Sequence, residues 1–359
     1  MGRNYRRRVL TAAAIATAAI CAIVPGTAGA ATVQDLVNAI NAGQTTVTKA
    51  LADTGISSPT HSTIPTGQGP VMSSALVAVT YSMANAETAP QGANDWTCKP
   101  SAAHPEPVVL LHGSWMNAFD AFSYLSPQIK SAGFCVYALN YGEEGLIQGG
   151  GLGALIPGRN GVGPMEDSAK QLSAFVDKVL ASTGAKKVNI VGHSQAGPVS
   201  DQYMKFEGGA SKVDQLITFG ATTHGTTLDG IATLGQRMSG YGIDALGISS
   251  VFVGQGLIEQ VTGSPFYAKL NANGDTVPGV TYTTVATSND EVSTPPSATF
   301  RTAVPGATVH NITLQDGCGI DWSDHLTMLY SPRAASIALH ALDPAGHPNL
   351  VCQFNPWLL

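Results

Sequence analysis

Charged side chains are scarce in this chain, and basic ones are scarcer than acidic ones. Asp, Glu, Lys and Arg make up 12% of the 359 residues, with 18 basic against 24 acidic side chains. Beyond a basic start there is no basic patch, which argues against a nucleic-acid partner. Together with 40 glycines, the low charge content indicates a compact, loop-rich protein with one large domain and an appendage.

Long apolar runs are missing too, apart from one near the start of the chain. Residues 9–24 form an alanine-rich apolar run of 16 residues, short of the about 20 that a membrane-spanning helix needs. Arginines precede this run, and Ala28-Gly29-Ala30 follows it as a small-x-small cleavage site. We predict a signal peptide over residues 1–30, hence secretion, rather than a membrane anchor. Cleavage would remove four basic residues and no acidic ones, leaving 14 against 24 and a net charge of −10.

Cysteine is infrequent, with five residues, and no Cys-x-x-Cys pair or histidine cluster indicates a zinc site. Loss of Cys21 with the signal peptide leaves four, and an even number in an oxidising compartment favours disulfides. We expect Cys98–Cys135 and Cys318–Cys352 rather than either crossed pairing, because each short-range pair pins one flank of the fold. Each would stabilise the fold by about 3–4 kcal/mol in the chain-entropy model.

The segment after the signal peptide differs from the rest of the chain. Residues 31–57 carry apolar side chains at helical spacing, and residues 58–70 are rich in Ser, Thr, Pro and Gly, as in a linker. Residues 71–95 give no firm pattern. We therefore expect an N-terminal helical and linker extension over residues 31–93 and a main domain over residues 94–359.

Apolar runs and amphipathic segments alternate along this main domain. Strands are expected over residues 107–111, 134–139, 188–191, 215–219, 280–286 and 309–314. Helices are expected over residues 121–132, 167–182, 195–207 and 334–342. The alternation predicts an α/β fold with a mostly parallel central sheet and helices on both faces.

One expected strand runs straight into a serine between small residues. The segment Gly192-His193-Ser194-Gln195-Ala196-Gly197 lies between the strand 188–191 and a helical segment. This layout is typical of a nucleophile elbow, a sharp strand-to-helix turn that exposes a serine hydroxyl. Ala196 departs from the pattern Gly-x-Ser-x-Gly, so the motif by itself could also be a plain turn.

A nucleophilic serine needs a base to take its proton and an acid to orient that base. In such folds the acid and then the histidine follow the serine along the chain. Asp290 and Glu291 come directly after the strand 280–286 and are the acid candidates. His325 lies after the last strand and before a helix, the position that a base requires.

Three other histidines follow Ser194 in the C-terminal part and suit the base role less well. His310 opens a strand and is expected to be structural, His340 lies within a helix, and His347 lies in a tail rich in Pro and Gly.

Two backbone amides should await the negative charge that develops on an attacked carbonyl oxygen. One is the amide of Gln195, directly after the nucleophile and at a helix N-terminus. The other is expected from the loop after the first strand, where Ser114 would give its amide and could also give its hydroxyl. His112 in the same loop is expected to brace it rather than act as a base.

Two glycine-rich, apolar segments, residues 141–164 and 225–263, fall where loops should cover the site. They would line an acyl pocket or form a lid; ordinary packing against the sheet is the alternative.

From about Asn94 to the C-terminus, the chain resembles the secreted class 2 triacylglycerol lipases of bacteria, especially the actinobacterial group. The segments that carry the resemblance are Pro107-Val108-Val109-Leu110-Leu111-His112-Gly113, Gly133-Phe134-Cys135-Val136, Gly192-His193-Ser194-Gln195, His224-Gly225-Thr226-Thr227-Leu228, Asn289-Asp290-Glu291-Val292 and Asp324-His325. The chain is also similar to the fungal lipase B type, in which cysteines placed like these form the two pairs expected above. Many members carry glycine where this chain has Ala196.

The resemblance implies an α/β-hydrolase fold and ester hydrolysis without a metal or cofactor. It selects Asp290 over Glu291, which is then expected to be a solvated loop carboxylate. The implied sites are a triad of Ser194, Asp290 and His325 and an oxyanion hole of Ser114 and Gln195. The expected partner is a lipid or other small ester, and a lipid–water interface is one place where the protein would bind it. We also expect the protein to be a secreted monomer.

Two other functions fit the same residues. An acyltransferase would use the same triad but pass the acyl group to an alcohol instead of water. A non-catalytic envelope or binding protein could keep the fold, since fold alone does not fix function and Ala196 alters the motif.

Overall fold

The computed structural model describes residues 61–144, 158–227 and 254–358. These residues form a seven-stranded sheet in the order β1-β3-β2-β4-β5-β6-β7. Its strands are β1 (His61–Thr63), β2 (Val108–Leu111), β3 (Val136–Glu143), β4 (Val188–His193), β5 (Val213–Phe219), β6 (Thr281–Ala286) and β7 (Thr308–Thr313). Every neighbouring pair is parallel except β1 with β3. The mostly parallel sheet predicted from the sequence is confirmed.

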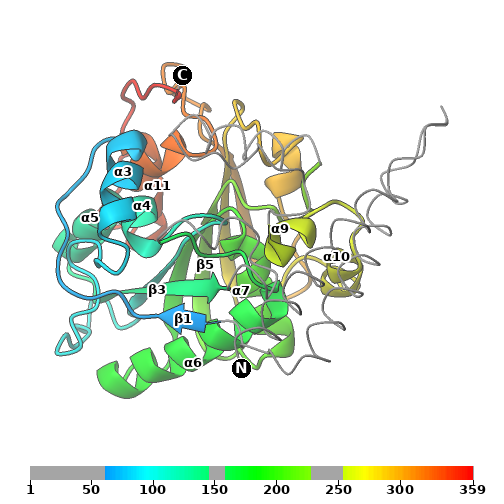
Figure 1. Cartoon of the computed structure of the whole chain (residues 1–359), viewed down its shortest axis with the longest axis horizontal. Coiled ribbons are helices and arrows are strands. Elements are labelled where there is room, and N and C mark those ends of the chain that lie inside the picture. Colours follow the sequence, from blue (N-terminus) through cyan, green and yellow to red (C-terminus); the bar gives the residue numbers. More distant parts are fainter. Residues whose placement is uncertain (1–60, 145–157, 228–253, 359) are drawn as a thin grey trace, which may run out of the picture.

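Helices cover both faces of this sheet (Figure 1). One face carries α3 (Ala75–Ala84), α4 (Ala118–Phe122), α5 (Leu125–Ser131) and α11 (Pro332–Leu342). The other carries α6 (Met165–Thr183), α7 (Ala196–Phe206) and α10 (Pro265–Leu270). The short α9 (Gln255–Ile258) lies between α7 and α10 along the chain, and the 3₁₀ turns are η4 (Pro296–Thr299) and η5 (Thr327–Tyr330).

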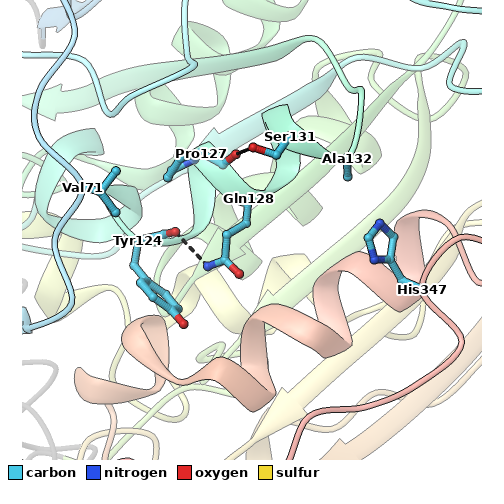
Figure 2. Close-up of a pocket in the computed structure, with 7 residues that line it drawn as sticks. All are labelled: Val71, Tyr124, Pro127, Gln128, Ser131, Ala132 and His347. Carbon is cyan, nitrogen blue, oxygen red and sulfur yellow. Dashed lines mark hydrogen bonds between the residues drawn. The ribbon is translucent and has the colours of Figure 1, made fainter.

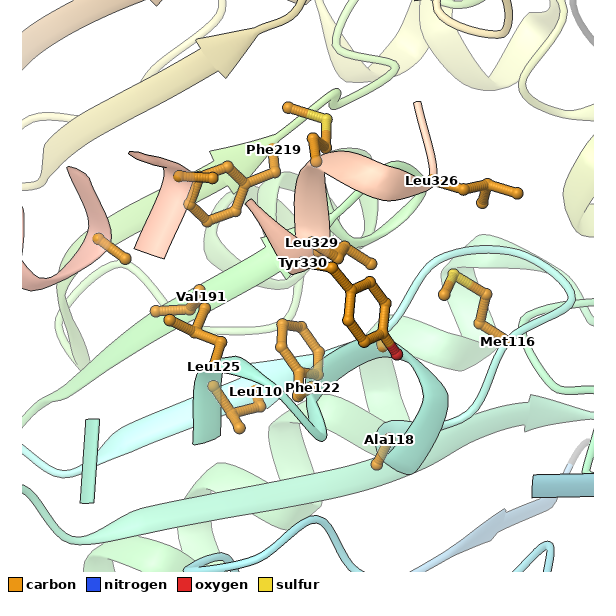
Figure 3. Close-up of a cluster of buried hydrophobic side chains, with 14 of the residues drawn as sticks. Leu110, Met116, Ala118, Phe122, Leu125, Val191, Phe219, Leu326, Leu329 and Tyr330 are labelled. Atoms are coloured by element: carbon orange, nitrogen blue, oxygen red, sulfur yellow. The ribbon is translucent and has the colours of Figure 1, made fainter. Parts of the chain in front are cut away.

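The central strand β2 is apolar throughout because both of its faces are covered. Val108 and Leu110 belong to the core on the α11 side, whereas Val109 and Leu111 belong to the core on the α6 side. Successive side chains of a strand point to opposite faces, so a strand covered on both faces needs apolar residues at every position. Figure 3 shows the first of these cores, in which Leu110 lies among side chains from α4, α5 and η5.

The single helix expected over residues 121–132 is wrong, because the segment forms two helices, α4 and α5. Pro127 explains the break. Proline has no N–H to donate to the carbonyl four residues earlier, and its ring collides with that carbonyl, here of Ser123. The chain therefore turns between Phe122 and Leu125 and starts a new helix in which Pro127 occupies the tolerant first turn.

The strand expected over residues 134–139 lies further along the chain, as β3. The sequence Asn140-Tyr141-Gly142 is typical of a turn, yet it continues the strand because β1 pairs with it, His61 opposite Glu143 and Thr63 opposite Asn140. Tertiary pairing here overrides local preference.

Residues 61–93 pack on the domain that was expected to begin at Asn94. β1 falls within the expected linker and joins the sheet, and α3 forms in the segment that the sequence left unassigned. Ser82 of α3 donates its hydroxyl to Asp120 of α4 at 2.8 Å. The boundary at residue 94 stays a prediction, and residues 31–60 lie outside the described part of the chain.

Both disulfides are confirmed. Cys98 pairs with Cys135 and Cys318 with Cys352, with Cα–Cα distances of 5.8 and 5.3 Å. The first ties the segment before β2 to the start of β3, and the second ties the C-terminal tail to the turn after β7. The described helices include none with the length and apolar character needed to traverse a bilayer.

The carboxylate of Glu259, just after α9, lies at the N-terminus of α6. It accepts hydrogen bonds from the amide of Met165 at 2.8 Å and from the side chain of Gln255 at 2.9 Å. Burial nevertheless raises the pKa of Glu259 from its ordinary value of 4.5 to about 7. Because folding raises this pKa, the contribution of Glu259 to the free energy of unfolding is greatest below about pH 4.5. It falls as the pH rises through about 7.

We therefore expect Glu259→Gln to raise the free energy of unfolding at pH 8 by on the order of 1 kcal/mol. At pH 4 the variant and the wild type should be nearly equal, because the wild-type carboxyl is then neutral as well. Urea denaturation at the two pH values measures this, with the exposed Glu87→Gln as the control. An equal change at pH 4 and pH 8 would contradict the prediction.

Candidate active site

Ser194 lies on a sharp turn between β4 and α7. Its φ angle is +54°, in the left-handed region that residues with side chains rarely occupy. Its amide donates to the carbonyl of Phe219 at the end of β5, and its carbonyl accepts from Gly197. Strain of this kind persists where the surrounding structure fixes it, as at functional turns. The strand, turn and helix of a nucleophile elbow are all present.

The methyl group of Ala196 fits the turn because Gly192 has no side chain. A β-carbon at residue 192 would lie only 2.7 Å from the Ala196 β-carbon. Ala196 is fully buried in the core on the α6 side. Pro198 occupies the third position of α7, within the first turn, where no amide hydrogen bond is lost. The turn thus accommodates both Ala196 and Pro198.

His325 and Asp290 form a buried pair. The Nδ1 atom of His325 lies 2.9 and 3.0 Å from the two carboxylate oxygens of Asp290. Asp290 is itself held by the amides of Val292 and Ser293, at 3.0 and 2.7 Å. The other ring nitrogen of His325, Nε2, is buried and has no hydrogen-bond partner among the described residues. The ring therefore offers one free nitrogen, which is what a base needs.

The acids around His325 raise its affinity for a proton. Burial lowers the pKa of His325, but the charge and hydrogen bond of Asp290, aided by Glu291 and Asp324, outweigh burial, so the pKa lies above its ordinary value. The carboxylate thus stabilises the imidazolium that forms when the ring takes a proton.

Glu291 is not the solvated carboxylate that the sequence predicted. Its carboxylate accepts from the backbone amide of His325 at 3.3 Å, and burial raises its pKa. The loop after β6 folds back on the histidine loop, so Asp290 reaches the ring and Glu291 reaches the backbone of the same residue.

Ser114 and the side chain of Gln195 both lie close to Gly161. A β-carbon at residue 161 would lie 2.9 Å from Oε1 of Gln195 and 3.1 Å from the Cα atom of Ser114. The loop that carries Ser114 packs against Ser194, since a β-carbon at Gly113 would lie 3.0 Å from the Ser194 β-carbon. Within the described segments, neither the Ser114 amide nor the Gln195 amide donates to an acceptor. Both are candidates to hold an oxyanion.

His112 braces this loop, as expected. Its Nδ1 atom lies 2.7 Å from the Gly113 carbonyl, and its Nε2 atom accepts from the amide of Tyr141 at 3.2 Å. The two rings stack with centroids 4.3 Å apart. Burial lowers the pKa of His112 to about 3, so the ring stays neutral. Arg159 adds a second brace, donating to the Trp115 carbonyl at 2.9 Å.

Two residues that the sequence did not single out support the pair. The Nε2 atom of His193 lies 2.8 Å from the backbone carbonyl of His325, which ties the histidine loop to the elbow. Gly220 has a φ of +55°, and a β-carbon there would lie 3.0 Å from Nδ1 of His325 and 3.1 Å from Asp290. Gly220 could have been noticed in the sequence, because it is a glycine directly after the strand expected over residues 215–219.

The other histidines lie elsewhere. His310 is exposed on β7, and His340 on α11 has its Nδ1 atom 2.8 Å from the carbonyl of His347. The expected covering segments, residues 141–164 and 225–263, lie in large part outside the described residues, because 145–157 and 228–253 are not among them.

A surface hollow of about 390 Å³ lies along α5 (Figure 2). Its lining residues are Val71, Tyr124, Pro127, Gln128, Ser131, Ala132 and His347. None of them belongs to the candidate site, and its open, shallow form gives it no part in the chemistry described above. Across the segments 61–144, 158–227 and 254–358, no group of three or more His, Cys, Asp or Glu side chains could hold a metal ion.

The sheet order and the elbow define an α/β-hydrolase fold, as predicted. Among solved structures, lipase B of Aspergillus fumigatus has a similar fold, with a TM-score of 0.51 and 18% identity over 68% of this chain and 55% of that chain.

The chain belongs to the class 2 lipase family, whose model matches residues 105–321. That stretch includes Ser114, Ser194, Gln195 and Asp290 and ends just before His325. Triacylglycerol lipases of Pseudarthrobacter phenanthrenivorans and Burkholderia plantarii are each 35% identical over 130 residues, 35% of this chain. The matches span about a third of those relatives, 34% and 30% of their lengths.

Proposed function

We propose that this protein is a secreted serine hydrolase of carboxylic esters that acts on acylglycerols. The observation that carries the proposal is the strained Ser194 turn, which His193 ties to the loop of a buried His325–Asp290 pair. The Nε2 atom of His325 has no partner among the described residues. Membership of the class 2 lipase family and the triacylglycerol lipases among its relatives support the substrate class. The predicted signal peptide and the two disulfides support secretion.

In the proposed mechanism Ser194 attacks the ester carbonyl carbon while its hydroxyl proton passes to Nε2 of His325. The new C–O bond places negative charge on the carbonyl oxygen, which the amides of Ser114 and Gln195 receive. The bond to the alcohol oxygen then breaks, and His325 returns the proton to the departing alcohol. Water repeats the sequence on the acyl-enzyme, releasing the acid and restoring Ser194.

Asp290 keeps the proton of neutral His325 on Nδ1, so Nε2 is free to accept. Its charge also stabilises the imidazolium that forms in each half of the reaction. Because both groups are buried, water screens this interaction little. No step requires a metal or a cofactor.

A fluorophosphonate probe tests the proposal directly, because it labels a serine only when a base activates it. We expect labelling of the folded mature protein at Ser194, together with hydrolysis of p-nitrophenyl esters and emulsified acylglycerols. Heat-denatured protein is the control. Failure of the folded protein to label would favour a non-catalytic role, and an acyl-alcohol product instead of free acid would favour the acyltransferase.

A further inference from the structure

Gln260 is a buried glutamine whose side chain ends beside Ser114. Its Nε2 atom lies 2.8 Å from the Ser114 hydroxyl oxygen and 2.9 Å from the Gly256 carbonyl oxygen. Its Oε1 atom accepts from the hydroxyl of Thr222 at 2.9 Å. The side chain is 2% exposed, so all of its hydrogen-bonding capacity is directed into the protein.

These contacts fix which end of the amide faces Ser114. A backbone carbonyl such as that of Gly256 only accepts, so the atom beside it must be the donating nitrogen. The same nitrogen carries a second hydrogen, and this one points at the Ser114 oxygen. Gln260 therefore donates to Ser114 and cannot accept from it.

The direction of that bond has a consequence for the Ser114 proton. With its oxygen already accepting from Gln260, the hydroxyl must turn its own hydrogen elsewhere, and within the described segments no acceptor is present for it. Ser114 lies on the loop that packs against the Ser194 β-carbon, so this hydroxyl belongs to the segment next to the proposed nucleophile.

The Gly256 carbonyl contacts the side chains of both Gln195 and Gln260. It accepts from Nε2 of Gln195 at 3.0 Å as well as from Gln260. Gln195 is thus held directly and Ser114 is held through Gln260, both by the first turn of α9. One carbonyl therefore links the side chain of Gln195 to that of Gln260, and through it to Ser114.

We propose that Gln260 is a positioning residue that turns the Ser114 hydroxyl proton toward the developing oxyanion. This inference rests on the proposed function. Gln260 does not touch the substrate; it acts through Ser114, which then offers a hydroxyl beside its amide. The developing charge meets three donors in place of two, and the third is oriented before the reaction begins.

A double-mutant cycle with Ser114→Ala tests the inference on p-nitrophenyl ester hydrolysis. Ser114→Ala removes the hydroxyl and should lower kcat by about 10²-fold. Gln260→Met keeps the length of the side chain but removes the donor, and should lower kcat by about 10-fold with KM little changed, because the hydroxyl is then free to rotate. In the Ser114→Ala background, Gln260→Met should cost nothing further.

Gln202→Met is the matched control, since Gln202 is also buried but lies on α7 away from Ser114; it should leave kcat unchanged. Gln260→Glu provides a second variant of the same shape. Once ionised, the carboxylate of this variant accepts a hydrogen bond from the Ser114 hydroxyl and so turns its hydrogen away from the oxyanion. The ratio of variant kcat to wild-type kcat should therefore fall as pH rises. Melting temperatures establish that each variant is folded.

Equal losses from Gln260→Met in both backgrounds would overturn the inference while leaving the proposed function intact, as would a loss confined to KM. A wild-type protein that turns over no ester would overturn the proposed function, and the inference with it. If Gln260→Met does not fold, the pH dependence of Gln260→Glu decides the question. A ratio of variant to wild-type kcat that does not change with pH would count against the inference.

Discussion

Ser194→Ala should lower kcat on a p-nitrophenyl ester by about 10⁴- to 10⁶-fold and abolish fluorophosphonate labelling. In the proposed mechanism the hydroxyl is the atom that bonds to the acyl carbon, and His193, next to Ser194, ties the turn to the loop that carries the His325–Asp290 pair. Removing the attacking atom leaves only what binding and the oxyanion donors supply. Ser131→Ala, at an exposed serine of α5, is the control and should keep full activity.

A stability measurement on the same position separates loss of chemistry from loss of fold. The φ of +54° at Ser194 strains alanine as much as serine, but glycine adopts it freely. Ser194→Gly should therefore be as inactive as Ser194→Ala and yet more stable than it, by about 1 kcal/mol. Full activity in a correctly folded Ser194→Ala protein would falsify the assignment of the nucleophile.

Asp290→Asn should lower kcat by about 10⁴-fold, because an amide facing Nδ1 of His325 favours the tautomer with its proton on Nε2. That tautomer cannot accept a proton from Ser194. The acid limb of the kcat/KM profile should also move to lower pH, since the charge of Asp290 helps to raise the pKa of His325. Measuring kcat/KM against pH for variant and wild type checks both effects.

Glu291 is the natural substitute for the lost carboxylate, and the structure argues against it. Its oxygen reaches the backbone amide of His325, 3.3 Å away, rather than the ring. Asp290→Asn combined with Glu291→Gln should thus cost little beyond Asp290→Asn alone, because Glu291 acts on the ring only through its charge; the exposed Asp316→Asn is an active control. A clear further loss in the double variant would show that Glu291 rescues the ring.

Much of the central sheet could be predicted because buried parallel strands have an unmistakable composition. β2 is covered on both faces and is apolar at every position, and β4 carries the apolar residues Val188, Ile190 and Val191. The amphipathic α6 was equally plain, with Gly184 ending it in a left-handed conformation at φ +78°. In these elements local pattern and tertiary contact agree.

Prediction failed where a distant partner decides the outcome. β3 continues past Leu139 only because β1 pairs with it, and nothing in Asn140-Tyr141-Gly142 announces that partner. The break between α4 and α5 could have been predicted, since Pro127 is visible in the sequence and its effect on an earlier carbonyl is general. The break between α4 and α5 thus has a local cause in the sequence, whereas the pairing of β1 with β3 has none.

The candidate site divides in the same way. Ser194 and His325 follow from motif and chain order, and the family resemblance selects Asp290 over Glu291; all of these are properties of sequence. Gln260 does not, since its contacts join three segments that the sequence places far apart: 146 residues separate it from Ser114. An orienting amide has no motif, because any buried glutamine of the right reach could serve.

The pairing of β1 with β3 also bears on how this protein meets other copies of itself. β2 covers one side of β3, and residues 61–63 cover the other. A chain shortened to begin at residue 94 would bare that second side and the apolar surface under α3, and an open strand edge recruits strands from neighbouring molecules. We therefore expect such a shortened chain to self-associate more readily than the longer one.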